Sequence, residues 1–64
     1  MFKMYNGMWL EVSKDYPGFQ VGEHYQVLDI MDQINEPTVF FLVGVKGHYS
    51  VSDAHNWLQP VSNS

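Results

Sequence analysis

Residues 38–45, Thr-Val-Phe-Phe-Leu-Val-Gly-Val, decide the fold class of this chain. The stretch combines β-branched residues with two phenylalanines, which suit a pleated strand and are poor helix formers. It is apolar without a break from Val39 to Val43, so either both faces of the strand are covered or one face binds a partner. We therefore expect a strand here and an all-β fold around it.

Turn signals and short strand-like runs follow toward the C-terminus. Lys46-Gly47-His48 predicts a tight turn, and residues 49–52 predict a further short strand. Asp53 is expected to cap one helical turn at Ala54-His55-Asn56, because the first backbone N–H groups of a helix need an acceptor.

The chain is expected to end in a strand and a short tail. Residues 58–61 predict the last strand, in which Pro60 requires a sheet edge or a strand end. With only 64 residues, the chain has room for one domain, which we place at residues 1–61, with a polar tail at residues 62–64.

Residues 23–35 fit either a helix or a strand. Four apolar residues follow the spacing of an amphipathic helix: Val27, Leu28, Met31 and Ile34. The strand interpretation places Tyr25 and Val27 on one face instead. Periodicity alone does not decide between the two.

The N-terminal part carries the strongest short hairpin signal in the chain, Asn6-Gly7. The alternative is a simple bend that leads into one strand at residues 8–12. Residues 13–18 predict a loop, in which Pro17 fixes φ and Gly18 can adopt a left-handed conformation.

Two stretches resemble the Src-homology-3 (SH3) barrel. Residues 19–28, Phe-Gln-Val-Gly-Glu-His-Tyr-Gln-Val-Leu, are similar to that family's diverging turn and the strand after it. Residues 56–60, Asn-Trp-Leu-Gln-Pro, are similar to its Asn-Tyr-Val-x-Pro, and residues 40–42 lie where the family carries its tryptophan pair. The order and spacing fit over residues 9–61.

The resemblance implies a small five-stranded SH3-like barrel, with an additional N-terminal hairpin as an option. It places the diverging turn at residues 19–23 and a 3₁₀ turn before the last strand at residues 53–57. It also favours a strand within residues 23–35, and makes residues 29–37 mostly a hairpin loop.

The family's proline-peptide groove is matched only in part. By position, Phe40 corresponds to the groove tryptophan, Trp57 to the groove tyrosine, and Tyr16 lies in the first long loop. However, the Ala-Leu-Tyr-Asp-Tyr signature is absent, and the loop between Trp9 and Phe19 is several residues shorter than the family's. The resemblance therefore implies the fold more strongly than proline-peptide binding. In length, the chain is similar to small stand-alone SH3-like proteins of bacteria and phages.

Ten aromatic residues are more than a small barrel can enclose together with its aliphatic side chains. The alternation of side chains along each strand, together with the resemblance, predicts a core of Phe19, Tyr25, Val27, Phe41, Val43, Val51 and Leu58. Exposed aromatic clusters mark interaction sites, and Trp and Tyr dominate binding hot spots. The expected partner-binding residues are Tyr16, Phe40, Trp57, Trp9 and Tyr49.

Composition limits the function further. The chain has no cysteine, so it can form neither a disulfide nor a thiolate zinc site. A formal net charge of −4 with only three lysines disfavours nucleic-acid binding, which needs several cationic contacts to phosphates. No apolar run reaches the ~20 residues of a membrane span, and we expect a soluble, cytoplasmic protein.

The acidic residues Asp29, Asp32 and Glu36 fall on the predicted hairpin loop. They either keep the tip of the hairpin soluble or form a negative patch that steers the domain toward a basic partner. The sequence supports both interpretations.

No constellation of residues predicts catalysis. His48, Asp53 and His55 could in principle approach one another, but they lack the paired spacing of a metal site. Ser52 lies close to His55 in sequence, yet a nucleophile also needs an oriented base and a dry pocket. We expect no enzyme activity, no metal and no cofactor.

The sequence therefore predicts a protein–protein interaction module, either an adaptor or a small inhibitor that binds a larger protein through an aromatic face. Two alternatives are a nucleic-acid-associated barrel, in which aromatics would stack on bases, and a homo-oligomeric structural component.

Overall fold

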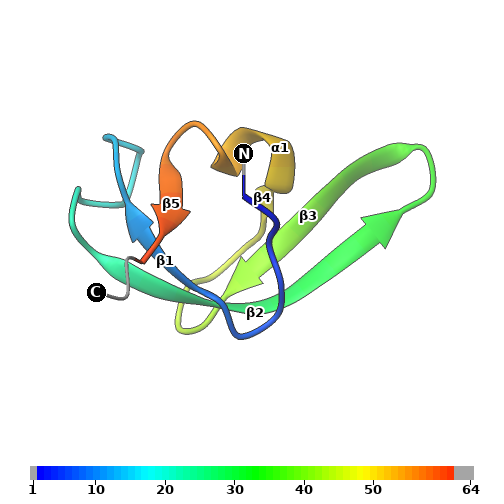
Figure 1. Cartoon of the computed structure of the whole chain (residues 1–64). Coiled ribbons are helices and arrows are strands. Elements are labelled where there is room, and N and C mark those ends of the chain that lie inside the picture. Colours follow the sequence, from blue (N-terminus) through cyan, green and yellow to red (C-terminus); the bar gives the residue numbers. More distant parts are fainter. Residues whose placement is uncertain (1, 62–64) are drawn as a thin grey trace.

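The computed structural model describes residues 2–61, which form five antiparallel strands and one short helix. In chain order these are β1 (Trp9–Val12), β2 (His24–Gln33), β3 (Glu36–Leu42), β4 (Tyr49–Ser50), α1 (Val51–Ala54) and β5 (Leu58–Pro60). The sheet order is β4-β3-β2-β1-β5, and the sheet curls into a half-barrel (Figure 1). The expected small all-β fold with five strands is confirmed.

Strands β2 and β3 form a long hairpin. Asn35, with φ of 61°, adopts the left-handed conformation in the two-residue turn after Gln33, which pairs with Glu36. The expectation that residues 29–37 are mostly loop is therefore wrong. The resemblance implied a loop, but cross-strand pairing continues through these residues almost to the tip.

Two β-bulges bend this hairpin. Leu28 is the extra residue on β2, between the pairs Val27↔Leu42 and Asp29↔Phe41. Farther along, β3 places residues 37–38 opposite a single residue of β2. Bulges strengthen the local twist and tolerate proline, which explains why Pro37 is accommodated within a strand.

The helical part of the connection from β4 to β5 begins earlier than expected. The sequence predicted a strand at residues 49–52, but only residues 49–50 are a strand. Helix α1 begins at Val51, and the Ser50 hydroxyl rather than Asp53 caps it, accepting the Asp53 backbone N–H at 3.5 Å. Two bonds of the 3₁₀ type follow, from the Asn56 N–H to the Asp53 carbonyl and from the Trp57 N–H to the Ala54 carbonyl. The expected 3₁₀ turn is thus present as the continuation of α1.

The N-terminal segment closes the side of the half-barrel rather than forming a hairpin. Asn6-Gly7 makes a turn, in which the Met8 N–H donates to the Tyr5 carbonyl, but residues 2–5 are not a strand. The segment runs from the neighbourhood of α1 to β2 (Figure 1), where the Gly7 N–H donates to the Val27 carbonyl at 2.8 Å. It buries Met4 and Met8.

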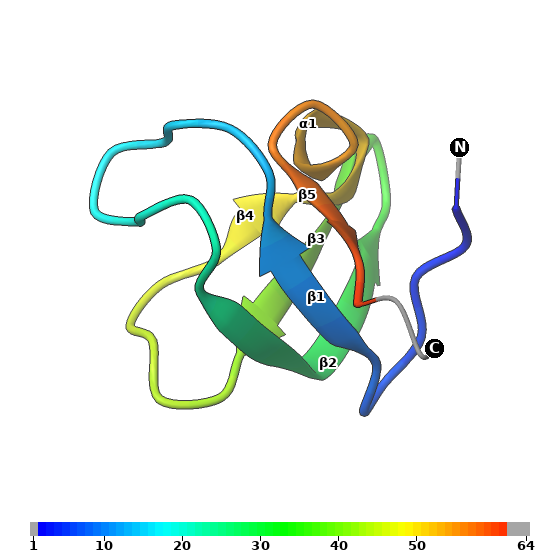
Figure 2. The ribbon, with the colours of Figure 1, turned by 60° about the vertical axis from the view of Figure 1, so that its left-hand side comes forward.

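The loop between β1 and β2 contains the two turns that the sequence predicted. Pro17 and Gly18 form the first, closed by a bond from the Phe19 N–H to the Tyr16 carbonyl. The second lies within residues 19–23, where Gly22 has a φ of 96°. This loop and residues 43–48 project on the same side of the molecule (Figure 2).

The core contains Phe40, whereas the sequence predicted Phe41 in that place. The buried cluster comprises Met4, Met8, Leu10, Val12, Phe19, Val27, Phe40, Leu42, Ala54, Trp57 and Leu58. Of the predicted core, Phe19, Val27 and Leu58 are buried, Tyr25, Phe41 and Val51 are half-buried, and Val43 is exposed. Phe40 is inward because it pairs with Ile30, which packs on the core, whereas Phe41 pairs with the exposed Asp29. The predicted tail, residues 62–64, lies outside the described residues.

Candidate interaction surface

Four of the five predicted partner-binding residues meet in one aromatic cluster. The Tyr16 and Trp57 rings stack with centroids 4.0 Å apart, and Tyr49 lies 5.8 Å from Trp57 and 5.9 Å from Phe40. Phe19 joins the cluster at 4.8 Å from Trp57. The structure thus brings these four residues together.

This cluster is mainly structural, however. Phe40 is fully buried and Trp57 is 2% exposed, while Tyr16 and Tyr49 are half-buried. The expectation that Phe40 and Trp57 belong to an exposed partner-binding face is therefore wrong. Their side chains fill the half-barrel, because its small core needs large aromatic residues.

Tyr16 fastens the β1–β2 loop to the helical connection. Its hydroxyl donates a hydrogen bond to Asp53 Oδ2 at 3.1 Å. This hydrogen bond, together with desolvation and the negative charge of Asp53, raises the pKa of Tyr16 above its ordinary value. The loop is held over Trp57, which further closes the groove that the resemblance implied.

Trp9, the fifth predicted residue, lies away from this cluster and is exposed. Leu10 and Val12 of β1 point into the core, so the alternation of a strand turns Trp9 outward. Trp9 is 53% exposed, and Tyr5, on the N-terminal segment, is 60% exposed. Both line one open hollow of about 420 Å³, together with Gly7, Met8, His24, Pro60 and Val61. We call this the Tyr5–Trp9 surface.

Sequence reasoning missed Tyr5 as a member of this surface. The Asn6-Gly7 turn places Tyr5 beside the hollow, and the Gln26 side-chain amide donates to the Gly7 carbonyl at 3.1 Å. The turn was visible in the sequence, but its path over the half-barrel was not. That path depends on burial of Met4 and Met8 in a core whose other residues are mostly distant in sequence.

One contact between a histidine and a carboxylate borders the Tyr5–Trp9 surface. His24 Nε2 lies 3.3 Å from Glu11 Oε1 across the β1–β2 pair. His24 lines the hollow, so the surface combines two exposed aromatic rings with one polar imidazole. Such a combination is typical of protein interaction sites.

The three predicted acidic residues lie on strands, not on a loop. Asp29 Oδ1 accepts the Asn6 side-chain amide at 3.3 Å and the Ile30 backbone N–H at 2.9 Å. Asp32 accepts the Thr38 hydroxyl at 2.8 Å, and Glu36 begins β3.

The histidines occupy separate places. His55 Nε2 lies 2.8 Å from the Phe2 carbonyl, His48 lies against the Phe41 ring, and His24 meets Glu11. Within residues 2–61 there is no group of three His, Cys, Asp or Glu side chains that could hold a metal ion.

A second, shallower hollow of about 370 Å³ lies between β3 and the helical connection. It is lined by Pro37, Thr38, Val51, Ser52 and His55. No aromatic ring of the predicted site reaches it.

In the part of the chain that the structure describes, no helix has the length and apolarity to cross a membrane.

Comparison with protein-family models, curated proteins and solved structures finds no match for this chain.

Proposed function

We propose that this chain is a non-enzymatic protein–protein interaction module that binds a larger protein through the Tyr5–Trp9 surface. The observation that carries the proposal is the pair of exposed aromatic rings beside one hollow. Exposed Trp and Tyr side chains supply large contact areas at low entropic cost and dominate binding hot spots. The remaining predicted aromatics stabilise the fold.

The strand order and the curled sheet support a further part of this proposal, that the fold is SH3-like. We extend it to a small adaptor or inhibitor of bacterial or phage type that acts in the cytoplasm. The short β1–β2 loop supports this extension. Because Tyr16 and Trp57 stack against each other, the partner is expected to bind outside the usual groove of that family.

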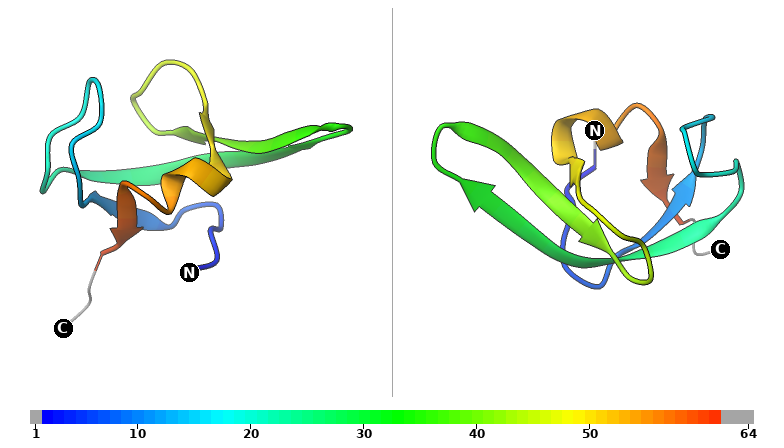
Figure 3. Two further views of the ribbon diagram at one scale, coloured as in Figure 1. Left: turned by 90° about the horizontal axis from the view of Figure 1, so that it is seen from above. Right: turned by 180° about the vertical axis from the view of Figure 1, so that it is seen from behind.

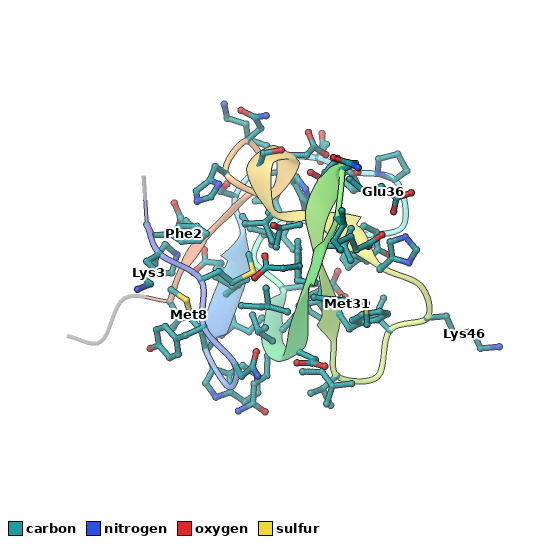
Figure 4. All side chains as sticks on the ribbon, turned by 90° about the vertical axis from the view of Figure 1, so that its right-hand side faces the viewer. Phe2, Lys3, Met8, Met31, Glu36 and Lys46 are labelled. Carbon is teal, nitrogen blue, oxygen red and sulfur yellow. The ribbon has the colours of Figure 1, made fainter. Side chains whose placement is uncertain are left out.

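The alternative of nucleic-acid binding has less support. The net charge is −4, and Lys3 and Lys46 lie on opposite sides of the molecule (Figure 4). Dispersed cations do not create the positive groove that follows a phosphate backbone. The Tyr5–Trp9 surface also contains no lysine.

Affinity capture from the cells that encode the protein tests the proposal. Wild type, Trp9→Ala and Val21→Ala are immobilised at equal density, after circular dichroism has shown that each is folded. Val21 is also exposed but lies outside the hollow, so it is the matched control. We expect wild type and Val21→Ala to retain the same protein and Trp9→Ala to lose it. Retention by Trp9→Ala, or capture of nucleic acid in place of protein, would contradict the proposal.

A further inference from the structure

The β2–β3 hairpin extends beyond its neighbours in the sheet. Strand β1 pairs with β2 only at residues 24–26, and the last backbone hydrogen bonds on that side join Met8 and Gly7 to Val27. On the other side, β4 pairs with β3 only at Val39 and Phe40. Residues 28–38 therefore form a two-stranded ribbon with no sheet neighbour on either side, and it projects from the half-barrel (Figure 3).

This ribbon exposes three large apolar side chains. Ile34, at the tip, is 91% exposed, Leu28, at the bulge, is 60% exposed, and Met31 is 46% exposed (Figure 4 labels Met31). They lie three residues apart, which regular alternation would place on opposite faces of a strand, but the extra residue at Leu28 offsets that alternation and Ile34 lies in the turn beyond β2. At about 3.3 Å per residue, they span about 20 Å. Apolar groups gathered on one projecting element are typical of an interaction site.

The same ribbon is purely acidic. Asp29, Asp32 and Glu36 lie on it, and residues 15–45 contain neither lysine nor arginine. Their hydrogen bonds come from neutral donors, the Asn6 amide, the Ile30 N–H and the Thr38 hydroxyl. Within the described residues, the one contact of a carboxylate with a side chain that can become cationic, His24–Glu11, lies outside the ribbon. Among residues 2–61, no lysine or arginine therefore forms a salt bridge with the carboxylates of the ribbon.

The negative charge of the ribbon indicates which kind of molecule can bind it. Pairing two copies of the ribbon would bring six carboxylates together, because each copy contributes three, and like charges placed opposite each other destabilise a pair of strands. Phosphate groups of nucleic acids or of an anionic membrane would be repelled in the same way. A partner that carries both cationic and apolar residues complements the carboxylates of the ribbon and can cover its exposed apolar side chains.

We propose that the ribbon is a second docking surface, which binds a basic amphipathic helix of a partner protein. The apolar face of the helix would cover Leu28, Met31 and Ile34, and its flanking lysines or arginines would meet the carboxylates. A helix rises 1.5 Å per residue, so a span of about 20 Å corresponds to about 14 residues. The ribbon is distinct from the Tyr5–Trp9 surface, so this proposal does not depend on the function proposed above.

Fluorescence anisotropy with a labelled helical peptide of about 14 residues, composed of leucine on one face and lysine on the other, tests this proposal. A peptide of the same composition in shuffled order, without an apolar face, is the control probe. The variants are Ile34→Ser and the pair Asp32→Asn with Glu36→Gln. Val21→Ser and Asp15→Asn are the matched controls, since both change exposed residues outside the ribbon.

We expect Ile34→Ser to raise the Kd for the amphipathic peptide about tenfold, the effect of losing one apolar anchor. The charge variant should weaken binding and reduce its dependence on salt. The control variants should bind as wild type does, and the shuffled peptide should bind weakly. No binding of the amphipathic peptide, or equal binding by Ile34→Ser, would overturn the proposal. Sedimentation showing a wild-type dimer that Ile34→Ser abolishes would overturn it as well, because the occupant would then be a second copy.

Discussion

The Tyr16 ring lies parallel to the Trp57 indole, with an interplanar angle of 10° and centroids 4.0 Å apart. The contact joins the β1–β2 loop to the residue that precedes β5. The Ser13 N–H also donates to the Trp57 carbonyl, so backbone and side chain of Trp57 hold the same loop. Trp57 thus holds the β1–β2 loop against the core, and its replacement should lower the stability of the fold rather than remove a binding contact.

Trp57→Ala should destabilise the protein by about 3–5 kcal/mol, the usual cost of truncating a buried aromatic residue. Total stability of a chain this long is on the order of 3–10 kcal/mol, so much of the variant population should be unfolded. Urea denaturation followed by circular dichroism measures the difference. Trp9→Ala, at an exposed site, should cost no more than about 0.5 kcal/mol. If both variants lost the same free energy of unfolding, the buried position of Trp57 and the exposed position of Trp9 would be contradicted.

Tyr16 should ionise at higher pH than an unperturbed tyrosine. Its hydrogen bond to Asp53 raises the pKa in the folded state above 10.0, so the neutral phenol is favoured by folding. The resulting stabilisation is fully present below pH 10.0 and is lost as the pH rises through the folded-state pKa. The tyrosinate absorbance of wild type minus that of Tyr16→Phe isolates this group.

Replacing the acceptor provides the control for that titration. Asp53→Asn removes the negative charge, and the pKa of Tyr16 should move back toward its ordinary value. Asp15→Asn changes a nearby carboxylate that does not accept from Tyr16, and should leave the titration as in wild type. An unchanged Tyr16 titration in Asp53→Asn would contradict the hydrogen bond.

The N-terminal segment should contribute to stability although it is not a strand. Met8→Ala should cost about 2–3 kcal/mol, because Met8 is buried in the main core and the truncation leaves a cavity. Lys3→Ala, on the exposed side of the same segment, should have almost no effect. Thermal unfolding of the two variants measures this difference. If Met8→Ala unfolds at the wild-type temperature, the segment does not close the half-barrel.

The hairpin tip should tolerate only residues that accept a left-handed backbone. At Asn35, where φ is 61°, a β-branched residue is expected to cost about 1–2 kcal/mol, so Asn35→Val should be destabilising. Asn35→Gly should retain wild-type stability or exceed it slightly. Urea midpoints of the two variants measure the effect, and equal midpoints would contradict the turn geometry.

The local signals in the sequence predicted local structure well. Pro17-Gly18 formed its turn, and the β-branched and aromatic stretch around Phe40 formed a strand. The face of that strand could not be predicted, because its residues from Val39 to Val43 are all apolar and carry no alternation. Pairing with β2 and the bulge at Leu28 decide that Phe40 points inward.

The candidate site was predicted only in part for a similar reason. Trp9 was expected among the binding residues and is exposed, but the resemblance also placed Phe40 and Trp57 on the surface, where they are not. The position of Tyr5 depends on the path of the N-terminal segment over the sheet. Long-range packing sets that path, and the spacing of residues within the segment does not reveal it.

Site-specific photo-crosslinking tests the proposed binding surface most directly. A photoreactive phenylalanine analogue is incorporated in cells at position 9, position 5 or the control position 21, and crosslinked products are identified by mass spectrometry. All three side chains are exposed, and only positions 5 and 9 line the hollow. The proposed function predicts one protein crosslinked at positions 5 and 9 and not at 21. Crosslinking at position 21 alone, or equally at all three positions, would contradict it.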